Sequence, residues 1–531
     1  MSATGRTTLL LFLVFQALYG LTSSGNTFRV PDEFEVYFQV EHFVDAGDLS
    51  VPQTLTIRRP VIEHGRVVGS QTVFFGEVGR DGRPYAPYGP LAALLALPQH
   101  LIARLVAWLA GVPRGTPPAS VAWVFLVGGL TMISSATAAA LAVAGFHRAA
   151  IALGAERPLA LTLSMLLGGA TVLWPYGTSF YSEGWQAAAF VWAAVFLLEA
   201  RARPARQTPL VVGASLLLTV AGLTKVTSLV FAPGFVVAAL ADRSSTREAR
   251  FRAAVALSLG IGLATAVHLA WNAHRFVSPF DFGYDWGETI PQPPARAFLL
   301  GDLPRGLAVL LLSPGKSIVL WAPVLLLVAT RAPQFWRREP AISLGLAVTG
   351  LTGLMFYGAY LFPEGGYSHG PRHLVPILPL LMLPAAGPER RPWPRAATIA
   401  VAVTGAAIAV MAVSISFLED QGIRGDLGSD RFAYYARITP APGRAWNQYR
   451  LAYIPFAASL TTGEWLRSTT LGQGPDVFPY HLMRARRMLP GGTQIPVWLV
   501  WALPSGWLLL LVAAARALWK HERCAPLHAI A

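Results

Sequence analysis

The chain has little charge, almost no cysteine and no compositionally simple segment. Asp, Glu, Lys and Arg make up 13% of its 531 residues, against about 25% in a soluble domain. The single cysteine, Cys524, excludes an intrachain disulfide, so the long polar segments fold without that cross-link. There is no Ser/Gly linker or short-period repeat, and no His/Cys cluster has the spacing of a zinc site.

Apolar residues dominate the chain instead, at 54% of the sequence and a mean hydropathy of +0.47. One membrane crossing needs about 20 apolar residues, so the recurring runs predict an all-α polytopic membrane protein with about 12 spans. The expected spans are 8–24, 121–146, 158–176, 183–200, 209–223, 227–241, 253–273, 316–330, 341–361, 373–387, 396–418 and 495–515. The first is interpreted as a retained signal-anchor helix. Two further apolar segments, 90–111 and 303–313, are expected to be interfacial or re-entrant helices on the outer side.

The segment 209–241 decides the topology. As a single helix of about 33 residues it would be about 50 Å long, which is too long for one crossing. Lys225 interrupts it, so two shorter helices with Lys225 at the turn are expected. With the N-terminus inside, the short arginine clusters then all fall on the cytoplasmic face, as the positive-inside rule requires. These clusters lie within 148–157, 201–206, 243–252, 331–338, 390–395 and 516–523.

This topology accounts for much of the net charge of +14 without a nucleic-acid partner. Both termini are expected to be cytoplasmic, and the polar regions 25–89, 276–302 and 419–494 are expected outside. Arginines in these outer regions do not follow from the positive-inside rule, and they suggest anionic ligands such as phosphates or lipid headgroups. The predicted organisation is a core of 1–418 that includes the first outer loop (25–89), an outer region of 419–494, and a last helix with a tail at 495–531.

Polar motifs gather on the predicted outer face. The acidic pair Asp32 and Glu33 follows the first apolar run, and Glu183 starts a helix, where the helix dipole favours a negative charge. Lys225, Lys316 and Arg372 supply cations. Neighbouring polar and aromatic residues that are candidates for substrate contact are Tyr85, Tyr88, Tyr367, His369 and His373.

Carboxylates and cations in one place suit the transfer of a sugar from a lipid phosphate. A carboxylate can serve as general base toward an acceptor hydroxyl, and Arg or Lys can hold the departing phosphate. The transition state resembles an oxocarbenium ion, so charges of both signs need stabilising. Simpler interpretations stay open at each position. Asp32, Glu33 and Glu183 are also suited to helix capping, Lys225 to snorkelling, and the tyrosines to an interfacial aromatic belt.

The order of these motifs resembles that of the GT-C superfamily of membrane glycosyltransferases, which includes protein O-mannosyltransferases and aminoarabinose transferases. The resemblance covers about residues 8–390 and rests on short segments of the sequence. These are Asp32-Glu33, 85–91 (YAPYGPL), Tyr181-Ser182-Glu183, 222–225 (GLTK), Ser278-Pro279 with 282–284 (FGY), 312–316 (LSPGK) and 370–374 (GPRHL). Relatives more often have Arg where this chain has Lys225.

The resemblance implies an inverting glycosyltransferase with a GT-C-like helical bundle in the bacterial inner membrane, acting on its outer face. The donor would be a sugar on a polyprenyl phosphate, and the acceptor a glycan, lipid or protein. Asp32 or Glu33 would be the base, with Asp32 matching the family position better. Lys225, Lys316 and Arg372 would contact the phosphate, and Glu183 would orient the acceptor or help to hold a metal. Mg²⁺ or Mn²⁺ stays open as a cofactor, because two carboxylates alone do not define a site for either ion.

Three alternatives remain at this stage. A transporter or flippase for a lipid-linked sugar would place its ionisable residues near mid-membrane, in two related halves. A non-enzymatic envelope assembly protein would fit large, arginine-rich outer loops. A glycan ligase or polymerase would keep the fold and change the reaction.

Overall fold

The computed structural model describes residues 3–24, 31–52, 56–63, 66–74, 76–113, 116, 123–283, 298–313, 315–360, 362–363, 365–366, 368–388, 393–414 and 497–524. Most of these residues are helical. The elements up to residue 202 are α1 (Ala3–Leu21), α2 (Pro31–Ala46), β1 (Thr56–Glu63), β2 (Arg66–Phe74), β3 (Glu77–Val78), β4 (Pro84–Tyr85), α3 (Pro90–Leu109), η1 (Val124–Gly128), α5 (Gly129–Thr131), α6 (Ile133–Ala152), α7 (Arg157–Gly169), α8 (Leu173–Gly177) and α9 (Glu183–Ala202). Those that follow are η2 (Pro204–Arg206), α10 (Gln207–Thr224), η3 (Val226–Phe231), α11 (Pro233–Ala241), α12 (Arg247–Arg275), η6 (Leu300–Asp302), α13 (Leu303–Leu312), α14 (Ile318–Trp321), α15 (Val324–Arg338), α16 (Pro340–Ala359), η7 (Arg372–Ile377), α17 (Leu378–Leu381), η8 (Leu383–Ala385), α18 (Arg395–Ser414) and α25 (Val497–Cys524).

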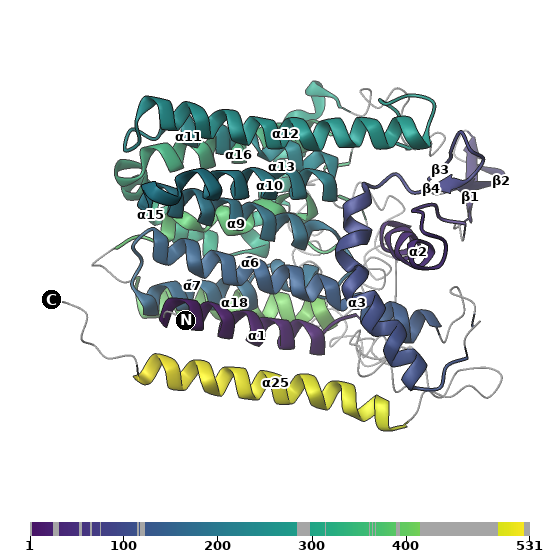
Figure 1. Ribbon diagram of the computed structural model, residues 1–531, viewed down its shortest axis with the longest axis horizontal. Coiled ribbons are helices and arrows are strands. Elements are labelled where there is room, and N and C mark those ends of the chain that lie inside the picture. The colour runs from purple at the N-terminus through teal and green to yellow at the C-terminus, as the bar shows by residue number, and fades with distance from the viewer. Residues whose placement is uncertain are drawn as a thin grey trace.

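The long helices run side by side in one bundle, and α2, α3 and the β-strands lie together at one end of it (Figure 1). Eight helices of the described residues are long and apolar enough to cross a membrane. They are Ala3–Leu21, Pro90–Leu109, Leu126–Ala152, Pro204–Thr224, Arg247–Arg275, Pro340–Ala359, Arg395–Val413 and Val497–Glu522. The protein is therefore a polytopic helical membrane protein, as its composition predicts.

Within the described residues, seven of the twelve expected spans coincide with these helices. The other five are shorter, more broken or less apolar than the eight that qualify: 158–176, 183–200, 227–241, 316–330 and 373–387. Segment 373–387 is the clearest case, because prolines at 376, 379 and 384 divide it into η7, α17 and η8. Pro323 separates α14 from α15 in the same way. By length and composition Pro90–Leu109 qualifies as a span, although the sequence predicted an interfacial helix there. Figure 1 shows α3 inclined to the long helices and beside α2.

Lys225 is where the segment 209–241 breaks, as expected. It is the C-cap of α10, with an extended backbone of φ −156° and ψ 120° that cannot continue the helix. The chain then turns back through η3 and α11, so that Gln207 and Asp242 line the same pocket at the far end of the bundle.

Alanine and glycine set the close packing at the centre of the bundle. Helix α6 is buried along most of its length and contacts α1, α7 and α9. A Cβ atom added at Gly145 would lie 2.7 Å from Val191 and 2.9 Å from Trp192, so only glycine permits this approach of α6 to α9. Small residues bring membrane helices into contact in this way.

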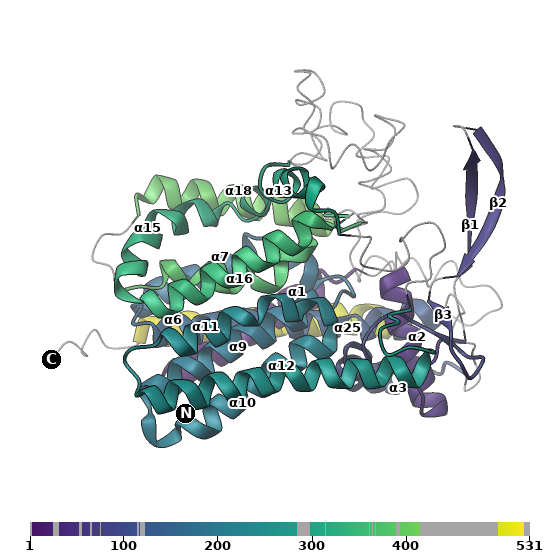
Figure 2. The ribbon, with the colours of Figure 1, turned by 90° about the horizontal axis from the view of Figure 1, so that it is seen from above.

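The first polar region has more structure than the expected outer loop of 25–89. Its α2 helix carries two acidic residues in its first turn, next to the positive end of the helix dipole. β1 and β2 form an antiparallel hairpin with Thr56 opposite Phe74 and Glu63 opposite Arg66, and this hairpin projects beyond the bundle (Figure 2). The sequence analysis did not predict these strands. The expected outer region 419–494 lies outside the described residues.

Candidate active site

Four charged side chains meet at the end of the bundle where α2 lies. The guanidinium of Arg372 donates from Nε to Glu183 Oε1 at 2.8 Å and from Nη2 to Asp32 Oδ1 at 3.1 Å. The ammonium of Lys225 donates to the same Glu183 oxygen, also at 2.8 Å. Two carboxylates and two cations thus form one connected ion-pair network, from residues as far apart in sequence as 32 and 372.

Local structure explains why each of these groups reaches the cluster. Glu183 begins α9 and Lys225 ends α10, so each charge lies at the helix end whose dipole stabilises it. Arg372 begins η7 just after Gly370, which has φ +58°. A Cβ atom at Gly370 would lie 2.8 Å from the ring of Trp321, so glycine is required there both for the backbone conformation and for the space.

Burial makes this network sensitive to the loss of any partner. The side chain of Glu183 is 1% exposed and that of Arg372 is 9% exposed, whereas Asp32 is 26% exposed. Arg372 also lies over the ring of Tyr181, with 4.1 Å from Cζ to the ring centroid. An ion in such surroundings is stable only with its partners in place. Of the two carboxylates in the network, Asp32 is the more exposed and Glu183 is fully enclosed.

The two adjacent carboxylates of the first turn of α2 have separate environments. Glu33 is fully buried and its Oε1 accepts a hydrogen bond from the backbone N–H of Phe180 at 2.9 Å. Asp32 faces Arg372 instead. Burial raises the pKa of Asp32, but the guanidinium of Arg372 opposes this effect, and the net pKa is lower than usual. Asp32 is therefore ionised at neutral pH, as a general base must be.

The predicted tyrosine contacts divide between two places. Tyr88 lowers the pKa of Asp32, so its hydroxyl lies beside that carboxylate. Tyr85 donates to Asp81 Oδ2 at 2.8 Å and packs edge-on against Trp271 and Phe276, away from Arg372. Tyr367 lies outside the described residues.

Lys316 is fully buried beside the cluster and holds the backbone that leads to Arg372. Its ammonium donates to the carbonyls of Gly366 at 3.1 Å and Ser368 at 2.7 Å, and to the Ser368 hydroxyl at 3.2 Å. These bonds take up the three N–H groups that a lysine offers. In this structure Lys316 therefore shapes the loop before Arg372, and its predicted contact with phosphate stays a prediction.

The two histidines also have structural contacts. The carbonyl oxygen of His369 accepts a hydrogen bond from Tyr176 at 3.0 Å, and its ring lies near Trp321. The ring of His373 stacks on Tyr357 with 4.2 Å between centroids, and its Nε2 lies 3.3 Å from the carbonyl of Phe362. A substrate contact by either histidine stays a prediction. Within the described residues no group of three or more His, Cys, Asp or Glu side chains is placed to hold a metal ion.

Two residues near the site had no role in the sequence analysis. Arg275 is fully buried at the end of α12, where it donates to the carbonyls of Ala86 and Tyr88 and to Asn272 Oδ1. It thus holds the backbone of Tyr88. Glu35 is buried with neither carboxylate oxygen hydrogen-bonded, and burial, with the nearby charge of Asp32, raises its pKa well above the usual value.

Lysine is rare in this sequence, and its positions point to the cluster. The sequence contains three lysines, Lys225, Lys316 and Lys520, among 42 basic residues, and two of the three lie at this end of the bundle. A lysine in a chain that otherwise uses arginine marks a position with a particular requirement for an ammonium group. No comparable signal marks Arg275 or Glu35.

Comparison with known proteins gives structural likenesses only. No protein-family model matches the sequence, and no curated protein is significantly similar to it. Among solved structures, ArnT from Cupriavidus metallidurans in the apo state is 14% identical, with a TM-score of 0.47, over 97% of this chain and 76% of that one. The same protein bound to undecaprenyl phosphate gives a TM-score of 0.44 at 14% identity, with the same shares of the two chains.

A second likeness is to the archaeal oligosaccharyltransferase AglB from Archaeoglobus fulgidus, in complex with an inhibitory peptide and a dolichol-phosphate. That chain is 13% identical with a TM-score of 0.42, and the match covers 91% of this chain and 58% of the other. This chain therefore corresponds to little more than half of that protein. At these values the function has to be argued from the site itself.

Proposed function

We propose that the protein is a membrane glycosyltransferase of GT-C type that transfers a sugar from a polyprenyl-phosphate donor to an acceptor hydroxyl. The observation that carries the proposal is the network of Asp32, Arg372, Glu183 and Lys225 at one end of the helical bundle. Two of the similar structures were solved with undecaprenyl phosphate and with dolichol-phosphate, respectively.

In this mechanism Asp32 accepts the proton of the acceptor hydroxyl. The acceptor oxygen forms a bond to the anomeric carbon of the sugar while the bond from that carbon to the phosphate oxygen breaks. Attack from the face opposite the leaving phosphate inverts the configuration at that carbon. Arg372 positions the base through its hydrogen bond to Asp32 Oδ1. The further the bond to the phosphate oxygen breaks before the bond to the acceptor oxygen forms, the more positive charge the sugar carries.

Lys225 and Arg372 stabilise the negative charge that develops on the departing phosphate. Within the described part of the chain the Lys225 ammonium has one hydrogen-bond partner, Glu183, and its side chain is 19% exposed, so N–H groups remain for a phosphate oxygen. Glu183 keeps the two cations together before the donor binds, because both donate to its Oε1. A preformed cation pair of this kind needs little reorganisation during the reaction.

The location of the network favours group transfer over transport. The charges lie where α9 begins and α10 ends, whereas a transporter for the same lipid would carry ionisable groups midway along its helices. The arginine-rich last turn of α9 and first turns of α12 lie at the opposite end of the bundle from these charges. By the positive-inside rule they would be cytoplasmic, which would put the site on the outer face of the bacterial inner membrane.

The proposal is tested with purified protein in proteoliposomes and a panel of polyprenyl-phosphate hexoses and pentoses, with release of free polyprenyl phosphate as the readout. Asp32→Asn removes the base and should reduce turnover at least a hundredfold, within the range of general-base contributions. Glu248→Gln makes the same chemical change at an exposed position near the opposite end of the bundle and should have no effect. Unchanged turnover in the double variant Asp32→Asn, Glu33→Gln would end the proposal.

A further inference from the structure

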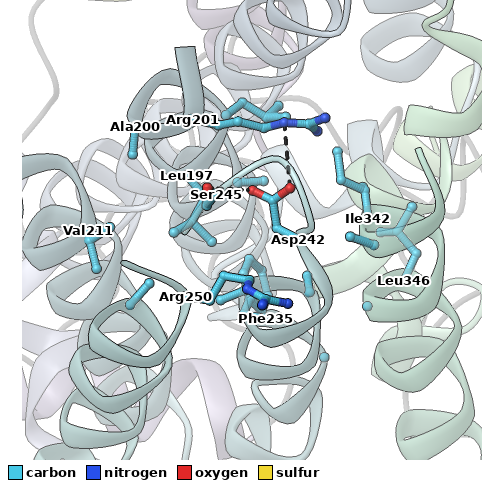
Figure 3. Close-up of a pocket in the computed structure, with 18 of the residues that line it drawn as sticks. Leu197, Ala200, Arg201, Val211, Phe235, Asp242, Ser245, Arg250, Ile342 and Leu346 are labelled. Atoms are coloured by element: carbon cyan, nitrogen blue, oxygen red, sulfur yellow. Dashed lines mark hydrogen bonds and ion pairs between the residues drawn. The ribbon is translucent and has the colours of Figure 1, made fainter. Parts of the chain in front are cut away.

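A second cavity lies at the other end of the bundle, far along the helices from Asp32. It is a half-open cavity of about 110 Å³ between α9, α10, α11, α12 and α16. Figure 3 shows Leu197, Val211, Phe235, Ile342 and Leu346 on its walls. The chamber is thus apolar, and nothing in the proposed reaction uses it.

Charged groups line one rim of this chamber. Arg201 pairs with Glu339 at 2.6 Å and lies 3.8 Å from Asp242, the contact drawn in Figure 3. Asp242 also accepts hydrogen bonds from the N–H and hydroxyl of Ser244 and from the hydroxyl of Ser245. Both carboxylates at the rim therefore have partners within the protein.

Arg250 is the group at the rim with an unused donor. Its Nη1 donates to the carbonyl of Leu240 at 3.2 Å, while its Nε is buried and has no hydrogen-bond partner. A buried donor of a charged group without a partner is costly, so an anionic oxygen at this point would be strongly favoured. Arg250 also lies in the first turn of α12, which begins at Arg247, where the helix dipole adds positive potential.

The surroundings indicate where such a ligand comes from. The walls that enclose the chamber carry large apolar side chains on their outer faces, including Leu216 on α10, Leu259 on α12 and Leu351 on α16, all at least half exposed. Such surfaces face acyl chains in a bilayer. The rim, by contrast, is basic, because residues 242–252 include four arginines and two acidic residues. Negatively charged lipid headgroups gather at surfaces of this kind.

We propose that this chamber binds an anionic glycerophospholipid, with an acyl chain between α9, α10, α11 and α16 and the phosphate at Arg250. The apolar walls match the chain, and the unused Nε matches a phosphate oxygen. The lipid fills space that the protein leaves empty, and it joins the ends of helices whose other ends carry Glu183 and Lys225. The site is independent of the proposed transfer reaction, since it shares no residue with it.

Native mass spectrometry and thermal unfolding of the full-length protein in detergent test this site. The probes are dioleoyl phosphatidylglycerol and, as the zwitterionic control with the same chains, dioleoyl phosphatidylcholine. We expect a retained 1:1 adduct and a higher unfolding temperature with phosphatidylglycerol, and at least fivefold weaker retention of phosphatidylcholine. Equal retention and equal stabilisation by the two lipids would overturn the proposal.

Two pairs of variants locate the site. Arg250→Gln should weaken phosphatidylglycerol retention at least fivefold, whereas Arg247→Gln, which changes an exposed arginine of the same helix turn, should not. Val211→Phe fills the chamber and should abolish the adduct, while Val212→Phe points away from it and should retain the adduct. The proposal is wrong if each variant behaves like its control, or if undecaprenyl phosphate displaces phosphatidylglycerol from this site at equal concentration.

Discussion

Arg372 gives the sharpest test of the ion-pair network. It makes one charge-assisted hydrogen bond to each of two carboxylates and lies over the ring of Tyr181. Arg372→Lys keeps the charge but reaches only one carboxylate, so it loses one hydrogen bond to a charged group, about 1.5–3 kcal/mol. Arg372→Met leaves Asp32 without a cation beside it and removes one of the two cations on Glu183. Breaking a buried ion pair in this way costs about 3–5 kcal/mol.

The pH dependence separates electrostatics from simple destabilisation. Asp32 has a depressed pKa, so its contribution to stability is present at neutral pH and is lost as pH falls through the folded-state pKa, below the usual value of about 3.9. Removal of the guanidinium raises that pKa. The acidic limb of the pH–rate profile should therefore move to higher pH in Arg372→Met and move little in Arg372→Lys.

The assays are release of polyprenyl phosphate from proteoliposomes across about pH 2.5–9, so that the wild-type acidic limb falls within the range, and thermal unfolding of the same preparations. Arg331→Met is the matched control, because Arg331 is also buried and lies over an aromatic ring, that of Trp393 at 3.7 Å, away from the carboxylate pair. It should lower the unfolding temperature and leave the acidic limb in place. An acidic limb that stays at the wild-type pH in Arg372→Met would refute the pairing of Arg372 with the base.

Further expected outcomes concern single contacts of the site. Lys225→Met should reduce turnover about 10–100-fold and raise KM for the lipid donor, since one charged hydrogen bond is lost, whereas Lys520→Met should behave as wild type in the same assay. Glu33→Gln should cost about 1 kcal/mol in thermal unfolding, because the amide oxygen can still accept the Phe180 N–H but without a charge. Glu35→Gln should instead stabilise the protein at pH 8, because a carboxyl with a raised pKa loses stability as pH rises; no gain at pH 8 relative to pH 5 would contradict its unpaired burial. Gly370→Ala should lower turnover and unfolding temperature together, since φ +58° costs alanine about 1–2 kcal/mol, and an unchanged enzyme would show that this turn does not position Arg372.

The sequence by itself determined the class of protein and the break at Lys225. Apolar runs of sufficient length must be helices in a bilayer, because only a helix satisfies its own backbone hydrogen bonds there. A helix of about 33 residues exceeds one crossing, which made a turn at Lys225 necessary. The charged residues Asp32, Glu183 and Arg372 also stood out, since charge is rare in this chain and costly to desolvate.

Only the tertiary structure determined which partner each charged side chain of the site contacts. Asp32 and Glu33 are adjacent in sequence, and nothing local distinguishes them, yet one pairs with Arg372 and the other with the backbone of Phe180. Lys316 and Lys225 look alike as isolated lysines, but the fold surrounds the first with carbonyl oxygens and places the second on a carboxylate. Such contacts join residues far apart along the chain, so their partners are set by helix packing rather than by any local pattern.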